Sequence, residues 1–181
     1  AKRLIEKSDP KKILYSLNLY ERTPRGNLLR VQTDNYDLPL NINEGVKLDL
    51  GSSAKLRTLV YYLEIIADLH ERYSSFSPQD LMELTAASED RLSQWAIAYL
   101  LEAEDRSLEK MLNAALKRSY SASPDERFFT GGGIHTFENF DSADDHQVMS
   151  VAEAFRGSIN LVFIRLMRDV VRFHMYGESS F

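Results

Sequence analysis

The sequence changes character at residues 48–57, which read LDLGSSAKLR. Before Gly51 the apolar residues alternate as in extended structure, whereas after it they recur at the three- and four-residue spacing of a helix. A serine at such a boundary can cap the helix by accepting hydrogen bonds from its free backbone N–H groups. The pattern therefore predicts a helix over residues 52–73, with Ser52 or Ser53 available as its cap.

The segment before this boundary predicts an antiparallel β-hairpin over residues 12–33. Residues 23–27 hold the proline and glycine of a tight turn, and residues 34–50 are expected to be mostly loop. The first strand shows its period of two in Ile13, Tyr15, Leu17 and Leu19.

The segment after the boundary is predicted to be mainly helical, with apolar stripes at helical spacing within residues 78–117 and 150–176. The last helix, from Leu161 to about Met175, is apolar on more than one stripe, so we expect it to be largely buried. Residues 118–147 lose this periodicity and predict a long loop. The predicted fold class is α+β and mostly helical, with the N-terminal hairpin followed by helices in a single domain.

Composition narrows the possible functions. The 181 residues fit one domain, and 22 basic against 27 acidic residues argue against nucleic-acid binding. The chain has no cysteine, and its four histidines lack the spacing of metal ligands, so no metal or other cofactor is expected. No apolar run reaches the roughly 18 residues that span a bilayer, and the first residues do not resemble a secretory signal.

Ser52 and Lys55 form the first candidate for chemistry. Residues three apart on a helix share a face, so this spacing brings a hydroxyl close to an amine. A desolvated lysine has a lowered pKa and can take the proton of a serine nucleophile. The same spacing also fits a capping serine followed by a surface lysine, which is the simpler interpretation of these residues alone.

Ser158 and Asn160 form the second candidate, on a short turn between two predicted helices. They offer a hydroxyl that can relay a proton and an amide that can hold a substrate carbonyl. Serine and asparagine are also common at helix ends, so this pair alone fits a cap equally well.

Taken together and in this order, three segments resemble the transpeptidase domain of bifunctional penicillin-binding proteins. Residues 48–57 are similar to that family's Gly-Ser-Thr-x-Lys stretch. Residues 137–141, FENFD, are similar to its Pro-x-Asn-Tyr-Asp stretch, and residues 149–160, MSVAEAFRGSIN, resemble its Ser-x-Asn region. The resemblance covers roughly residues 12–73 and 127–176, and it implies a fold of the serine β-lactamase and penicillin-binding transpeptidase type.

The resemblance also implies roles for four residues. Ser52 matches the nucleophile that is acylated by a D-Ala-D-Ala stem peptide of peptidoglycan, or by a β-lactam, and Lys55 matches the residue that activates it. Ser158 would shuttle a proton to the leaving group, and Asn160 would hold the peptide carbonyl. The parent protein would be periplasmic, anchored in the inner membrane, and would carry a glycosyltransferase domain.

Three departures qualify the match. The sequence holds no Lys-Thr-Gly, the family's third motif, whose strand also supplies half of the oxyanion hole. Ser52 and Ser158 lie 106 positions apart, so residues 78–117 resemble an insertion, and Leu56 stands where the family often has proline.

We therefore expect residues 1–181 to be a partial, catalytically incomplete domain. Its unpaired strand edges and uncovered apolar faces favour self-association. Two alternatives remain open at this stage: a non-catalytic interaction module of the cell envelope with a degenerate transpeptidase-like fold, and a serine β-lactamase-like hydrolase.

Overall fold

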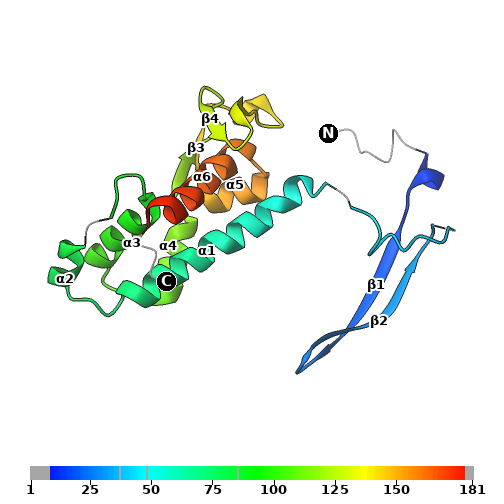
Figure 1. Cartoon of the computed structure of the whole chain (residues 1–181), viewed down its shortest axis with the longest axis horizontal. Coiled ribbons are helices and arrows are strands. Elements are labelled where there is room, and N and C mark those ends of the chain that lie inside the picture. The colour runs from blue at the N-terminus through cyan, green and yellow to red at the C-terminus, as the bar shows by residue number, and fades with distance from the viewer. Residues whose placement is uncertain (1–8, 37, 48, 85, 178–181) are drawn as a thin grey trace. The chain divides into compact units, whose positions relative to one another are not determined.

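The protein is α+β, as predicted, in a computed structural model that describes residues 9–36, 38–47, 49–84 and 86–177 (Figure 1). The chain divides into two compact units, residues 1–49 and 50–181, which are described separately. None of the helices in the described ranges is long and apolar enough to cross a membrane. That the two units belong to one partial transpeptidase-like domain stays a prediction.

The first unit is a β-hairpin, which confirms the prediction for this segment. Strands β1 (Ser16–Thr23) and β2 (Gly26–Asp34) pair antiparallel, with an irregularity in register after Leu19. Gly26 takes a φ of 128° in the turn, a value that side chains other than hydrogen disfavour. A 3₁₀ helix, η2 (Pro10–Lys12), precedes the hairpin. Large apolar side chains of both strands are exposed: Leu17, Leu19, Leu29 and Val31.

The second unit is built around the long helix α1 (Ala54–Tyr73), which follows a 3₁₀ turn, η3 (Gly51–Ser53). It packs against α3 (Arg91–Glu102), α4 (Leu108–Leu116) and α6 (Asn160–Tyr176), as Figure 1 shows. The apolar stripe of α1 supplies much of the core, with side chains from the other helices completing it. The core includes Leu59, Tyr62, Ile66, Leu69, Leu92, Leu100, Met111, Leu166 and Val170.

Two short helices begin with a capping box, in which a serine and an acidic residue satisfy each other's backbone N–H groups. Ser77 and Asp80 form one at the start of α2 (Pro78–Glu83), and Ser150 and Glu153 form the other at the start of α5 (Val151–Gly157). The helices predicted over residues 78–117 and 150–176 are confirmed. The first range contains α2, α3 and α4, and the second contains α5 and α6.

The long loop predicted over residues 118–147 is wrong in part. β3 (Ser119–Ser121) pairs antiparallel with β6 (Val148–Ser150), and β4 (Arg127–Thr130) pairs antiparallel with β5 (Gly133–Thr136). A 3₁₀ helix, η4 (Ser142–Asp144), lies between β5 and β6. Strands of three or four residues contain too few positions to show an alternating pattern, which is why periodicity did not predict them.

The prediction that the last helix is largely buried is also wrong for one of its faces. Leu161, Leu166 and Val170 of α6 are buried, whereas Met167 and Val171 are exposed. The exposed residues line a groove that is described below.

Two clusters of charged residues tie α6 to the segment that follows α4. Asp169, with no exposed surface, accepts a hydrogen bond from the Tyr120 hydroxyl at 2.8 Å and pairs with Arg118 at 3.4 Å. Arg165 pairs with Glu126 at 3.0 Å. These contacts hold the strands β3 and β4 against α6, which is the helix that carries Asn160 at its start.

Candidate active site

Ser52 and Ser53 lie in the 3₁₀ turn η3, just before α1. Gly51 opens this turn at a φ of 53°, in the left-handed region that glycine adopts without strain. The capping role predicted for these serines is wrong, because neither hydroxyl accepts a hydrogen bond from a backbone N–H of the first turn of α1. The Ser53 hydroxyl instead donates to the Leu50 carbonyl at 2.5 Å. Ser52 is thereby left to interact with Lys55.

Lys55 brings all four predicted site residues together. Its Nζ donates to Ser52 Oγ at 3.0 Å, to Ser158 Oγ at 3.2 Å and to Asn160 Oδ1 at 2.7 Å. An ammonium group has three N–H donors, so each of them has one acceptor here. Only 9% of the residue's surface is exposed. The alternative of a surface lysine beside a capping serine is therefore wrong.

Burial lowers the pKa of the Lys55 ammonium, because the charged form loses its hydration. The three groups bonded to the amine are neutral, two hydroxyls and one amide, so none of them offsets this loss with a negative charge. The neutral amine consequently forms at a lower pH than in an exposed lysine. This is the property that a lysine needs in order to act as a base.

Ser158 adopts an unusual backbone conformation at the end of α5. Its φ of 56° and ψ of 38° place it in the left-handed region, which costs a non-glycine residue about 1–2 kcal/mol. The residue links α5 to α6, which begins two positions later at Asn160. The serine is therefore at a helix end, as its residue type predicts, but its side chain is used at Lys55 and not as a cap.

Asn160 is the first residue of α6, and its side-chain amide has a defined orientation. Its Nδ2 donates to the backbone carbonyl of Glu138 at 3.0 Å, and its Oδ1 accepts from Lys55. Because a carbonyl only accepts and a lysine ammonium only donates, exchanging the amide's oxygen and nitrogen would break both bonds. Residues 137–141, which carry part of the resemblance, are thus next to the predicted site.

Sequence reasoning assigned no role to Asn139, whose Oδ1 accepts from the backbone N–H of Leu161 at 3.0 Å. The residue lies inside the FENFD segment, which was the one signal pointing to it. Asn139 and Leu161 are 22 positions apart, and no local sequence pattern predicts a contact over such a separation.

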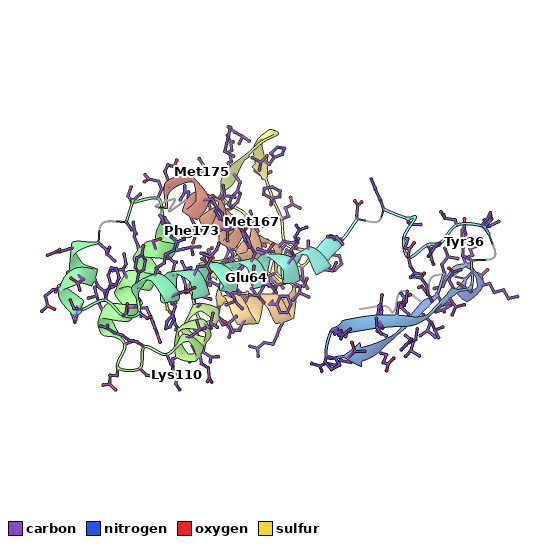
Figure 2. All side chains as sticks on the ribbon, turned by 60° about the horizontal axis from the view of Figure 1, so that its bottom comes forward. Tyr36, Glu64, Lys110, Met167, Phe173 and Met175 are labelled. Carbon is purple, nitrogen blue, oxygen red and sulfur yellow. The ribbon has the colours of Figure 1, made fainter. Side chains whose placement is uncertain are left out.

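A groove of about 1150 Å³ extends from the site along α6. Lys55 and Asn160 line it, and so do Val171 and the two methionines of α6 that Figure 2 labels, Met167 and Met175. The lining residues run from the first to the last residue of α6, a length of about 24 Å for this helix. Lys55 and Asn160 therefore face a long surface that is largely apolar, whereas Ser52 and Ser158 are not among its lining residues. Self-association through exposed faces of this kind stays a prediction.

No family model matches the sequence, and no curated protein or solved structure gives a significant match to the chain. In the described ranges, no group of three or more His, Asp or Glu side chains has the arrangement of a metal site. Any assignment of function therefore has to rest on the residues that meet at Lys55.

Proposed function

We propose that Ser52 is the nucleophile of a serine acyl-transfer site, of the kind that penicillin-binding D,D-transpeptidases use to cross-link peptidoglycan. The observation that carries the proposal is the convergence of Ser52, Ser158 and Asn160 on Nζ of Lys55, a residue with 9% of its surface exposed. This arrangement supplies a nucleophile, a base with a lowered pKa and a second hydroxyl within reach of the same proton.

The neutral form of Lys55 explains why its three partners differ. A neutral amine has two N–H donors and one lone pair. The carbonyl oxygen of Asn160 is an acceptor only, so it takes one N–H, and Ser158 takes the other. The lone pair then faces Ser52, whose hydroxyl proton it accepts. Asn160 and Ser158 thus orient the base toward the nucleophile.

The proposed reaction is a two-step acyl transfer. Ser52 Oγ attacks the carbonyl of the D-Ala-D-Ala peptide bond, and its proton moves to Lys55. The C–N bond breaks, the leaving D-Ala amine receives a proton through Ser158, and the acyl group remains on Ser52 as an ester. An amine of a second stem peptide then attacks the ester, forms the cross-link and returns a proton to Ser52.

Electrostatics at the site favour the negative charge that develops on the attacked carbonyl oxygen. Ser52 lies in the 3₁₀ turn that leads into α1, two residues before the helix, and Asn160 begins α6, so both lie near the positive ends of helices longer than four turns. Preorganised dipoles of this kind stabilise an oxyanion without having to reorient during the reaction.

The proposal places the third motif outside these 181 residues, because the sequence contains no Lys-Thr-Gly. The chain alone is accordingly proposed to be catalytically incomplete. A periplasmic location and a membrane-anchored parent belong to the same proposal.

The test uses a longer product of the same gene that includes a Lys-Thr-Gly. It is incubated with a stem peptide ending in D-Ala-D-Ala and an amine acceptor, and D-Ala release and the transfer product are quantified. We expect both products, and we expect their loss in Ser52→Ala but not in Ser53→Ala. The neighbouring Ser53 is a matched control because its hydroxyl is bonded to the Leu50 carbonyl and not to Lys55. Equal turnover in Ser52→Ala and the unaltered protein would overturn the proposal.

A further inference from the structure

Helix α6 begins without a cap of its own. The first backbone N–H groups of a helix have no partner within the helix, and a side-chain oxygen at the preceding residue usually satisfies one of them. That residue is Ile159 here, which has no such oxygen, and the Asn160 side chain faces Lys55. The missing acceptor comes from Asn139, whose Oδ1 accepts from the Leu161 N–H at 3.0 Å.

The amide nitrogen of Asn139 is bonded as well. Its Nδ2 donates to the backbone carbonyl of Ala122 and to Asp145 Oδ1, both at 2.8 Å. Ala122 follows β3 and is completely buried, and Asp145 follows the 3₁₀ helix η4. One side chain therefore connects the end of β3, the η4 turn and the first turn of α6. The Leu161 N–H can only donate, and the Ala122 carbonyl and the Asp145 carboxylate can only accept. The orientation of this amide is therefore also defined.

The backbone carbonyl next to Asn139 in sequence is hydrogen-bonded to the site residue Asn160. The carbonyl of Glu138, the preceding residue, accepts the hydrogen bond from Asn160 Nδ2 at 3.0 Å. With Asn139 bonded on both sides, that carbonyl stays where the Asn160 amide can reach it. The nitrogen of Asn160 is then occupied, and its oxygen points at Lys55 Nζ, 2.7 Å away.

We propose that Asn139 is a positioning residue of the acyl-transfer site, acting through the Glu138 carbonyl and the start of α6 to aim Asn160 at Lys55. Its hydrogen bonds go to Ala122, Asp145 and Leu161 and not to Ser52 or Lys55, so its proposed effect on the base is indirect. The inference rests on the proposed function in that it treats this arrangement of Lys55 as the productive one.

The test compares Asn139→Ala with Ser77→Ala in the 181-residue chain by NMR. Ser77 is a matched control because it also accepts from a helix N–H, that of Asp80 in α2, and has no contact with the site. The readout is hydrogen exchange of the Asn160 side-chain amide, which the Glu138 carbonyl protects. We expect exchange about tenfold faster in Asn139→Ala and unchanged within twofold in Ser77→Ala.

A second variant keeps the test decisive if Asn139→Ala does not fold. Asp145→Ala removes one acceptor of the Asn139 amide and leaves the cap on Leu161 in place. We expect a smaller increase, of about two- to fivefold, in exchange of the Asn160 amide. Exchange that stays at the unaltered rate in whichever of the two variants folds would overturn the positioning role, because it would show that Asn160 keeps its place without Asn139.

A second readout separates this inference from the proposed function. In the longer gene product, we expect Asn139→Ala to slow acylation of Ser52 by penicillin by about 10- to 100-fold, by analogy with the loss seen when a residue that orients a metal ligand is replaced. If the longer product is not acylated at all, the proposed function fails, whereas the exchange result still decides whether Asn139 positions Asn160. If acylation is unchanged while exchange accelerates, the positioning role in catalysis is wrong.

Discussion

Lys55 Nζ and Asn160 Oδ1 lie 2.7 Å apart, although 105 positions separate the two residues in sequence. Both belong to the first turn of a long helix, α1 and α6 respectively. Two positive helix ends thus converge on one buried amine, an arrangement that disfavours further positive charge and favours an anion. Burial lowers the pKa of Lys55, and the proposed oxyanion stabilisation is consistent with the two helix ends beside it.

Replacing Lys55 by methionine should separate function from stability. Lys55→Met keeps the length of the side chain and removes a charge whose burial is costly. We expect acylation of Ser52 to be abolished, and the free energy of unfolding at pH 7 to stay equal or rise by about 1 kcal/mol, as is common when a functional residue is replaced. Urea denaturation measures the stability, and a loss of several kcal/mol would show that Lys55 has a mainly structural role.

The difference in free energy of unfolding between Lys55→Met and the unaltered protein should depend on pH. In the unfolded chain Lys55 keeps its proton up to the ordinary pKa of 10.5, whereas in the folded chain it loses the proton at lower pH. Between these two pKa values the unfolded state binds more protons, so the stability of the unaltered protein rises with pH relative to Lys55→Met. The stability of Lys55→Met relative to the unaltered protein should therefore fall as the pH rises from 7 toward 10.5. A difference that is constant over this range would contradict burial of the ammonium.

Two substitutions of Ser158 should have different effects on stability and the same effect on chemistry. Ser158→Gly and Ser158→Ala both remove the hydroxyl that accepts from Lys55. Only glycine adopts the left-handed backbone at this position without strain. We expect Ser158→Gly to be more stable than Ser158→Ala by about 1 kcal/mol, measured by thermal unfolding. Acylation in the longer gene product should slow by about 10²-fold or more in both. Equal stability of the two variants would show that the backbone at residue 158 is not strained.

The buried ion pair between Asp169 and Arg118 should be important for folding. The guanidinium of Arg118 lies over the rings of Trp95 and Tyr120, 5.4 Å from each centroid, and Asp169 is its acidic partner. Asp169→Ala leaves this cation without a counter-charge in a buried environment, which typically costs about 3–5 kcal/mol.

The control for this prediction is an ion pair on the surface. Glu21→Ala breaks a pair with Arg30 in which both side chains are more than half exposed, and it should change stability by less than about 1 kcal/mol. Urea denaturation of both variants provides the comparison. A cost for Asp169→Ala that is no larger than for Glu21→Ala would mean that water reaches the buried pair.

The residue types of the site could be predicted from the sequence, but the way in which they meet could not. Ser52 and Lys55 are near neighbours, so helical spacing alone placed them together. Ser158 and Asn160 reach the same amine only through the packing of α6 on α1, which local spacing does not contain. The strained backbone of Ser158 was equally unpredictable, because serine rarely adopts it.

The fold was predicted best where elements are long. The hairpin and α1 have enough residues to show a period, whereas β3 has three residues and β4 four, which is too few to show one. The apolar residues of α6 predicted a largely buried helix, yet periodicity does not distinguish a covered apolar face from an uncovered one such as that of Met167 and Val171. Asn139 caps a helix from 22 positions away, a contact that only the folded chain reveals.

The most direct test of the central claim is the intact mass of the protein after incubation with a penicillin. It is measured on the 181-residue chain and on the longer gene product, each with Ser52→Ala and Ser53→Ala controls. We predict that the longer product gains one penicilloyl group, that the adduct maps to the peptide containing Ser52, that it disappears only in Ser52→Ala, and that the short chain stays unmodified. A longer product that stays unmodified, or a gene without a Lys-Thr-Gly, would contradict acyl transfer at Ser52 and favour a non-catalytic interaction module.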